Sequence, residues 1–459
     1  MTAGAVETDT GFDRRLLAPM MIGSILNPIN SSIIAIALVP IAVALGAPAS
    51  QTAWLVSGLY LATAVGQPVM GRLIDVHGPR RLYLVGALCT VAAGILGVVA
   101  PDLWVLVIAR VLLGIGTCAA YPASMYLIRM EGDRTGTASP AGVLTALSVT
   151  TQTIAVIGPT LGGLLIGLGG WRATFAVNIP LGVAILVLGL LFLPRTVPAS
   201  GGQGTGSDWV GVALFTAMVL SLLVFLMHLS LDRMWLPVLA VGVGTAFVLW
   251  ERRRTHPFID VAVFVGNRPL VVTYVRAVLA ATVSYSYLYG YTQWLQETRE
   301  LSATAAGLVL LPTFVVGIVV SVTTGRRPQI RRKLLVGAVA QMAAAALILS
   351  TWTDAPVWYL VLTAAVTGVP QGLINLAVQN TLYHQADPGR MGASSGLLRT
   401  FMYSGAMLAS AASGAFFGAR ATTAGVHELA LFMLVVAAVL AVLTVVDRSL
   451  RAVDAAAQS

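Results

Sequence analysis

The sequence predicts an all-α, polytopic membrane protein with fourteen transmembrane helices. Composition is the first reason: 57% of the 459 residues are hydrophobic, only 10% are charged, and the mean hydropathy is +0.87. A soluble domain is nearer one quarter charged. The second reason is that apolar runs of about 20 residues, each long enough to cross a hydrocarbon core of about 30 Å, recur along the whole chain. The third is that the few charged residues gather between these runs.

Each apolar run is interpreted as one helix that begins and ends where polar residues, Gly or Pro interrupt it. The first fifteen residues hold three acids and two arginines without a short apolar segment, so they do not resemble a cleavable signal peptide. The predicted spans are 16–46, 52–74, 82–100, 103–130, 142–167, 174–194, 209–229, 234–250, 269–294, 303–324, 334–352, 356–378, 392–418 and 428–446.

The basic residues predict the orientation of these spans. With the N-terminus in the cytoplasm, 20 of the 27 Lys and Arg residues lie in cytoplasmic loops or helix ends, four lie in outer loops and three lie within spans. Such an excess is expected of the cytoplasmic side. Both termini are therefore predicted to be cytoplasmic, and topology explains the net charge of +9 without a nucleic-acid partner.

The order of the spans predicts six helices, then two, then six. The segment "VPASGGQGTGSD" (197–208) is a Gly/Ser-rich, flexible linker. The basic stretch "GRRPQIRRK" (325–333) occupies the same place among the last six helices as "GRLIDVHGPRR" (71–81) among the first six. Internal repetition of this kind is common in secondary transporters. The predicted parts are a six-helix bundle at 1–194, a linker with two additional helices at 195–268, and a six-helix bundle with a cytoplasmic tail at 269–459.

The sequence offers little chemistry for catalysis. Both cysteines lie within apolar runs, and the five histidines are scattered without the spacing of metal ligands. No Ser/His/Asp grouping is present. We therefore predict no metal site, no cofactor and no enzymatic activity.

The stretch 71–81 gathers much of the charge between two apolar runs. Interpreted as a loop, it contains two glycines that permit a tight turn and arginines that hold it on the cytoplasmic side. Its acid, Asp75, could pair with Arg129 or face the positive N-terminal end of a neighbouring helix. A plain solvated loop is the alternative. The candidate residues of this gating loop are Gly71, Asp75, Gly78, Arg80 and Arg81.

Two glycine-bearing runs lie in spans 103–130 and 142–167. Small residues let membrane helices approach closely, and a proline removes a backbone donor and can kink a helix. A kinked, close-packed helix could shape a cavity and seal one end of it, whereas plain helix packing is the alternative. The residues that this reasoning concerns are Gly158, Pro159, Gly162 and Gly163 in the second run, while the first run contains Arg110 and Gly114.

Several motifs together resemble the major facilitator superfamily. The stretch 71–81 is similar to that family's G-x-L-x-D-x-x-G-x-R-R loop, and "RVLLGIG" (110–116) resembles its fourth-helix motif. "GPTLGG" (158–163) resembles the fifth-helix motif of its antiporters, and "GWRATFAVNIPLG" (170–182) resembles the run that enters its sixth helix. "SSIIAIALVPIA" (31–42) resembles the first-helix signature of its fourteen-helix drug:proton antiporter branch. The resemblance covers essentially the whole chain.

This resemblance implies a major facilitator fold, with two pseudo-symmetric six-helix bundles that work by alternating access. It also implies that Asp75 is a gate element that latches the bundles together on the cytoplasmic side, while Gly71, Gly78 and Arg81 shape the loop. The chain departs from the family at Val76 and Pro79, where the family often has basic residues. The charge of the loop is therefore weaker, but its acid and glycines are kept.

Polar side chains deep in lipid are costly and usually face the protein interior. In span 356–378, two amides lie four residues apart and share one helix face. Arg276 and Tyr287 are close to three turns apart, although Tyr291 and Trp294 beyond them could belong to an outer aromatic belt. Some of the amides could simply hold helices together. The residues predicted to face a central substrate cavity are Asn27, Asn30, Gln152, Arg276, Tyr287, Gln371, Asn375 and Arg399.

The predicted cavity is electropositive. None of the 18 acids lies in the middle of a predicted span, and Asn27 and Asn30 stand where the drug:proton antiporter branch commonly carries an aspartate. Arg110, Arg276 and Arg399 lie within spans, and arginine stays protonated, although such side chains can also extend towards the membrane surface. The sequence therefore predicts neutral or anionic solutes and weak or indirect proton coupling.

The resulting hypothesis is a secondary active transporter of the plasma membrane that exports amphipathic small molecules, such as drugs or natural products. Its expected partners are a small-molecule substrate and the lipid bilayer, with protons left open as a coupling ion. An importer of organic anions is one alternative. A non-transporting membrane sensor or lipid-handling protein is another, although the chain contains no large soluble sensory domain.

Overall fold

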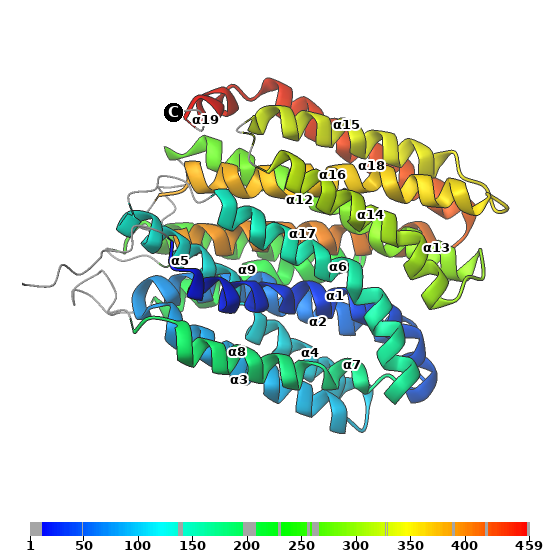
Figure 1. Ribbon diagram of the computed structural model, residues 1–459, viewed down its shortest axis with the longest axis horizontal. Coiled ribbons are helices and arrows are strands. Elements are labelled where there is room, and N and C mark those ends of the chain that lie inside the picture. The colour runs from blue at the N-terminus through cyan, green and yellow to red at the C-terminus, as the bar shows by residue number, and fades with distance from the viewer. Residues whose placement is uncertain are drawn as a thin grey trace, which may run out of the picture.

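The computed structural model describes residues 12–47, 49–135, 141–195, 208–227, 231–254, 258, 266–325, 327, 329–387, 391–417 and 421–456. Within these ranges the protein consists of helices and their connections, and no strand is present. The long helices run side by side (Figure 1). The all-α prediction is confirmed.

The first half of the chain forms eight α-helices that make six crossings. The fourth crossing is divided between α4 and α5, and the sixth between α7 and α8, because short turns interrupt both. The bounds are α1 Leu17–Leu45, α2 Ala49–His77, α3 Pro79–Val99, α4 Leu103–Thr117, α5 Ala120–Thr135, α6 Ala141–Gly169, α7 Ala173–Ala176 and α8 Asn178–Phe192.

Two further helices, α9 (Trp209–Met227) and α10 (Trp235–Glu251), precede the second half. In the second half, α12 continues into a π-helical turn, η3, and then into α13, so that all three make one crossing. The bounds are α12 Arg268–Ser286, η3 Tyr287–Tyr291, α13 Thr292–Glu297, α14 Ala303–Thr324, α15 Ile330–Leu349, α16 Val357–Gln385, α17 Met391–Phe417, α18 Thr423–Val446 and the short α19 Ser449–Ala456.

The helices have the length and composition of membrane spans. Among the described residues, nine helical segments are long and apolar enough to cross a membrane on their own. The other crossings are α2, α6, α9, α10 and α17, which bring the described total to fourteen. The predicted fold of fourteen membrane helices is confirmed.

Polar residues at the ends of the apolar runs cap several of these helices. The Asp102 side chain accepts hydrogen bonds from the backbone amides of Trp104 and Val105 at the start of α4. Ser302 and Thr422 cap α14 and α18 in the same way. Each cap satisfies backbone donors that have no partner within the helix, so the loop sequences themselves mark where the helices begin.

Helices of the first half pack mainly on one another, as α1 does with α6 and α3 with α8. Helices of the second half do the same, as α12 does with α17 and α15 with α18. The halves meet along two seams, α2 against α17 and α6 against α14. The α9–α10 pair lies outside this arrangement, and α9 packs against both helices of the α2–α17 seam.

One end of the molecule, called the basic end below, carries the connections with Arg80, Arg81, Arg331 and Arg332. It lies at the left of Figure 1, where α1 begins, α2 ends and α19 lies. That this end faces the cytoplasm remains a prediction. The division into bundles at 1–194 and 269–459 also remains a prediction.

Two local expectations were wrong. The stretch 71–81 is not an extended loop, because α2 continues to His77 and α3 begins at Pro79. The whole reversal is made at Gly78, whose φ of +84° lies in the region that glycine tolerates best. The sequence Asn27-Pro28 predicts a local break, but α1 runs continuously past Pro28.

Candidate functional site

A cavity of about 170 Å³ lies between the two halves. Its lining includes Ser31 near the midpoint of α1 and Gln371 near the midpoint of α16, so it sits at mid-membrane depth. Side chains from α1 and α6 form one side, and side chains from α12, α14, α16 and α17 form the other. Movement of one half against the other would therefore change the shape of this cavity.

Four of the eight predicted cavity residues line this space: Asn27, Gln371, Asn375 and Arg399. Asn27 also donates a long hydrogen bond of 3.4 Å to the Thr117 hydroxyl, and Gln379 donates to the Asn375 side-chain oxygen at 3.0 Å. These neighbours fix the orientation of the amides. Their contact with a substrate remains a prediction.

Arg399 is the charged member of the described cavity lining. Its guanidinium carbon lies 4.0 Å from the centroid of the Tyr121 ring, which makes a cation–π contact. Its Nε is buried and has no hydrogen-bond partner among the described residues. Among the described residues, no ion pair joins Arg399 to a carboxylate.

Asn30 and Arg110 belong to a separate, buried network, which corrects the expectation that Asn30 faces the cavity. The Asn30 amide donates to the Asn178 side chain at 2.6 Å and to the Leu26 carbonyl at 2.8 Å. Arg110 donates to the Leu55 carbonyl at 2.9 Å and to the Asn30 carbonyl at 3.3 Å. These bonds tie α4 and α8 to α1 and α2, because each polar group finds its partner within the first half.

Arg276 is also not a cavity residue. It is fully buried and forms an ion pair with Asp447, at the junction of α18 and α19. Burial raises the pKa of the Asp447 carboxyl, but hydrogen bonds from Arg276 and Ser449 outweigh that effect and hold the pKa below its usual 3.8. The positive charge of Arg276 is therefore matched inside the second half.

The predicted face of α12 is displaced by one residue. The cavity is lined by Ala277, Ala281, Tyr285 and Leu288, and one residue corresponds to about 100° around a helix. Tyr287 therefore points elsewhere, and its hydroxyl shares a hydrogen bond of 2.8 Å with Thr313 of α14.

Tyr287 begins a buried aromatic stack. Its ring centroid lies 5.3 Å from that of Tyr291, which in turn lies 5.7 Å from that of Trp294. Tyr291 is 1% exposed and Trp294 is 0% exposed. Their alternative assignment to an outer aromatic belt is therefore wrong.

The glycine motifs mark close helix crossings. A Cβ at Gly114 would come within 2.8 Å of the Leu59 carbonyl oxygen of α2, and a Cβ at Gly158 would overlap the Ser32 hydroxyl of α1. A Cβ at Gly162 would lie 3.3 Å from the Ile33 Cα. Gly163 lies in α6 beside them. The side chains of Gln152 and Pro159 lie outside the described part of the structure.

The gating motif occupies the end of α2 and the start of α3. Gly71 is buried, and Arg80 donates to the Leu190 carbonyl of α8 at 2.8 Å. Arg81 is exposed. The side chain of Asp75 lies outside the described residues, so its role as a latch remains a prediction. Its proposed partner Arg129 pairs with Asp133 at 3.3 Å.

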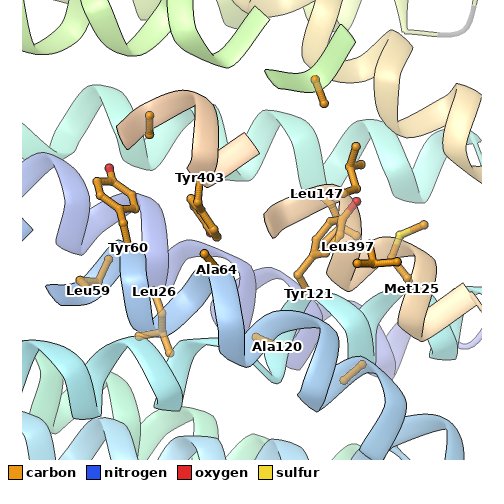
Figure 2. Close-up of a cluster of buried hydrophobic side chains, with 14 of the residues drawn as sticks. Leu26, Leu59, Tyr60, Ala64, Ala120, Tyr121, Met125, Leu147, Leu397 and Tyr403 are labelled. Atoms are coloured by element: carbon orange, nitrogen blue, oxygen red, sulfur yellow. The ribbon is translucent and has the colours of Figure 1, made fainter. Parts of the chain in front are cut away.

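A group of tyrosines that the sequence did not predict joins the two halves. The Tyr60 hydroxyl of α2 shares a short hydrogen bond with the Tyr289 hydroxyl of η3. The Tyr60 ring centroid lies 5.5 Å from that of Tyr403 and 5.9 Å from that of Tyr285. Figure 2 shows Tyr60 and Tyr403 facing each other across the α2–α17 seam. The spacing of Tyr285 and Tyr289 was the available signal, but Tyr60 lies too far away in sequence to be paired with them.

The group of tyrosines is one layer of contacts between the halves, and a second contact layer lies nearer the basic end. Figure 2 shows Tyr121, Met125, Leu147 and Leu397 gathered from α5, α6 and α17. All four are buried. Leu147 precedes the cavity residue Thr151 by one turn, and Leu397 precedes Arg399 by two residues. The cavity therefore has contacts between the halves on both of its membrane sides.

A polytopic helical bundle whose two halves line a cavity at mid-depth has the architecture of a membrane transporter. Residues 20–410 match the family model described as the Major Facilitator Superfamily. The chain belongs to the major facilitator superfamily, and is accordingly a transporter rather than an enzyme.

Named relatives extend this result. An uncharacterized MFS-type transporter, YwoD, of Bacillus subtilis is 32% identical over 90% of this chain and 92% of its own length. The tetracenomycin C resistance and export protein of Streptomyces glaucescens is 28% identical over 88% of this chain and 76% of its own length. The crystal structure of the human organic anion transporter MFSD10 has a TM-score of 0.63 at 14% identity, covering 94% of this chain and 99% of that one. The last similarity shows the fold alone.

Proposed function

We propose that this protein exports amphipathic small molecules, such as antibiotics or natural products, across the cell membrane. The observation that carries the proposal is the cavity between the two halves, which combines amide and hydroxyl groups with aromatic and alanine side chains. Such a lining suits a solute that has both polar and apolar parts. The direction of transport is supported by relatives that confer drug resistance or export an antibiotic.

The proposed mechanism is alternating access. Rocking of the 1–194 bundle against the 269–459 bundle would expose the cavity first at the basic, cytoplasmic end and then at the opposite end. The two ends of the seams would have to open in turn, so that the contact layers on the two membrane sides of the cavity break alternately. Asp75 would latch the cytoplasmic side, so that its charge biases the equilibrium between the two states.

The cavity favours neutral or anionic solutes, because its described lining contains Arg399 and no carboxylate. A proton carrier needs a group whose pKa can cross the working pH, and arginine does not supply one. We therefore expect weak or indirect proton coupling. Import of organic anions is the alternative that the same lining would allow.

A toxicity screen in a drug-sensitive host tests the proposal. Cells with and without the protein are compared over compounds sorted by charge, and a Gly158→Leu variant, whose side chain would force α6 away from α1, serves as the inactive control. Export predicts that cells with the protein tolerate higher concentrations of several amphipathic compounds. Greater sensitivity and accumulation of organic anions would instead support import, and no difference across the set would contradict both.

A further inference from the structure

We infer that the cavity binds aromatic organic anions, and that the acid group of the solute, a carboxylate or a sulfonate, is held by Arg399. This inference rests on the proposed transport function and narrows its substrate class. Three features set Arg399 apart from the other arginines within the membrane spans: it lines the cavity, its Nε has no hydrogen-bond partner among the described residues, and no described carboxylate pairs with it.

The three arginines within the membrane spans differ in their partners. Arg110 is held by two backbone carbonyls, and Arg276 is neutralised by Asp447. Arg399 alone of the three lines the cavity. A charge in a low-dielectric interior is costly unless it is paired. The described residues give Arg399 an aromatic ring and no carboxylate, so an anionic solute would supply the missing partner.

The geometry of the Arg399 guanidinium group suits the acid group of a solute. The Tyr121 ring centroid lies 4.0 Å from the guanidinium carbon. The hydrogen-bond donors of a guanidinium group lie in its plane and number five, so one tyrosine cannot occupy them all. The buried Nε has no acceptor within the described part of the chain. A carboxylate or sulfonate presents two oxygens with the spacing that an arginine edge can bind in a bidentate way.

The cavity surface around the Arg399 charge is aromatic and apolar. Tyr285, Tyr403 and Phe314 supply aromatic walls, while Ala277 and Ala281 leave space between them. Such a surface suits a flat ring that stacks on or meets the edges of the aromatic side chains. A solute with one acid group attached to an aromatic ring satisfies both parts of the cavity, whereas an aromatic amine would place a second positive charge beside Arg399.

Three naphthalene compounds of similar size isolate the charge. They are 1-naphthalenesulfonate, the neutral 1-naphthalenesulfonamide and the cationic 1-naphthylmethylammonium. Binding to the purified full-length protein is measured from the fluorescence of the naphthyl group, and uptake of the sulfonate is measured in proteoliposomes. The variants are Arg399→Gln, Arg399→Lys and, as a control outside the cavity, Arg252→Gln at the exposed end of α10.

The inference predicts that the wild-type protein binds the sulfonate most tightly and the ammonium least. Arg399→Gln should weaken sulfonate binding about tenfold to a hundredfold, as expected for loss of a hydrogen bond to a charged group, and change sulfonamide binding less than twofold. Arg399→Lys should recover part of the loss because it keeps the charge without the fork. Arg252→Gln should leave the binding of all three compounds unchanged.

Two results separate failure of this inference from failure of the transport proposal. Equal effects of Arg399→Gln on all three compounds, or tightest wild-type binding of the ammonium, would refute the anion site and leave transport untouched. Selective, Arg399-dependent binding of the sulfonate without uptake into liposomes would support the site and count against transport. Absence of binding for all three compounds would refute the site.

Discussion

The hydrogen bond between Tyr60 and Tyr289 should bias the equilibrium between the two access states. It joins α2 of the first half to η3 of the second half. Tyr289 follows the cavity residue Leu288 and lies five residues beyond Ser284, or about 7.5 Å further from the basic end at 1.5 Å per residue. Separation of the halves on this side of the cavity must break the bond.

Its magnitude follows from its burial. Tyr60 is 2% exposed, so Tyr289→Phe leaves a buried hydroxyl without this partner and costs the closed arrangement about 1–3 kcal/mol. Tyr60→Phe does the same from the other side. When both hydroxyls are removed, no buried hydroxyl is left without its partner, so the free-energy cost of the double variant should be smaller than the sum of the two single costs. The difference between them, the interaction energy, should be about 0.5–3 kcal/mol.

The assay measures how fast a cysteine at Ser284 reacts with an impermeant thiol reagent added on the side opposite the basic end. The native Cys89 and Cys118 are first replaced by alanine. Each single Tyr→Phe variant should raise the labelling rate about fivefold or more, since 1.4 kcal/mol corresponds to a tenfold change in population. The double variant should raise it less than the product of the two single effects.

Tyr287→Phe is the matched control, because Tyr287 also loses a buried hydrogen bond but its partner Thr313 lies in the same half. Its labelling rate should stay within about twofold of the parent, by the same estimate for a bond that does not cross the seam. Equal effects of Tyr287→Phe and Tyr60→Phe, or fully additive effects of Tyr60→Phe and Tyr289→Phe, would refute the reasoning.

Three other predictions concern topology, the latch and pH. A cysteine at Asp232 should react with an impermeant reagent in intact cells while one at Arg451 should not, because the basic end is predicted to be cytoplasmic; the opposite pattern would reverse the orientation. Asp75→Asn should sharply slow substrate flux in proteoliposomes without changing expression or the unfolding temperature, because it removes the charge and keeps the shape; unchanged flux would leave the stretch as an ordinary basic turn. Asp447→Asn should lower the unfolding temperature at neutral pH, because the depressed pKa of Asp447 means that its pairing stabilises the fold above its usual pKa of 3.8 and is lost as the pH falls through the lower folded-state value. The difference from wild type should therefore shrink at strongly acid pH, and a difference that is constant with pH would argue against titration of this carboxyl.

The sequence predicts where the helices lie, because an apolar run of membrane length is a local property. It could also place Gln371 and Asn375 together, since a spacing of four residues fixes a shared face within one helix. It failed for Arg276, whose partner Asp447 lies 171 residues away. Only packing of α12 against α18 brings that pair together, and no periodicity within either helix contains this information.

The displaced face of α12 has a related cause. A spacing of eleven residues places Arg276 and Tyr287 on one side of a continuous helix, but a polar or aromatic face can be turned towards another helix of the same half as well as towards a cavity. The structure turns the smaller residues, such as Ala277 and Ala281, to the cavity. Space for a solute is created there by the absence of large side chains, a signal that a search for polar residues overlooks.

The position of α9 restricts the route by which a solute can reach the cavity. Amphipathic compounds dissolve in the leaflets of the bilayer, so a carrier can receive them sideways from the lipid as well as from water. On one flank of this protein α9 packs against both α2 and α17 and so lies over their seam. Lateral entry would then use the flank formed by α6 and α14. In that case the two additional helices would limit access from the lipid to one side of the carrier.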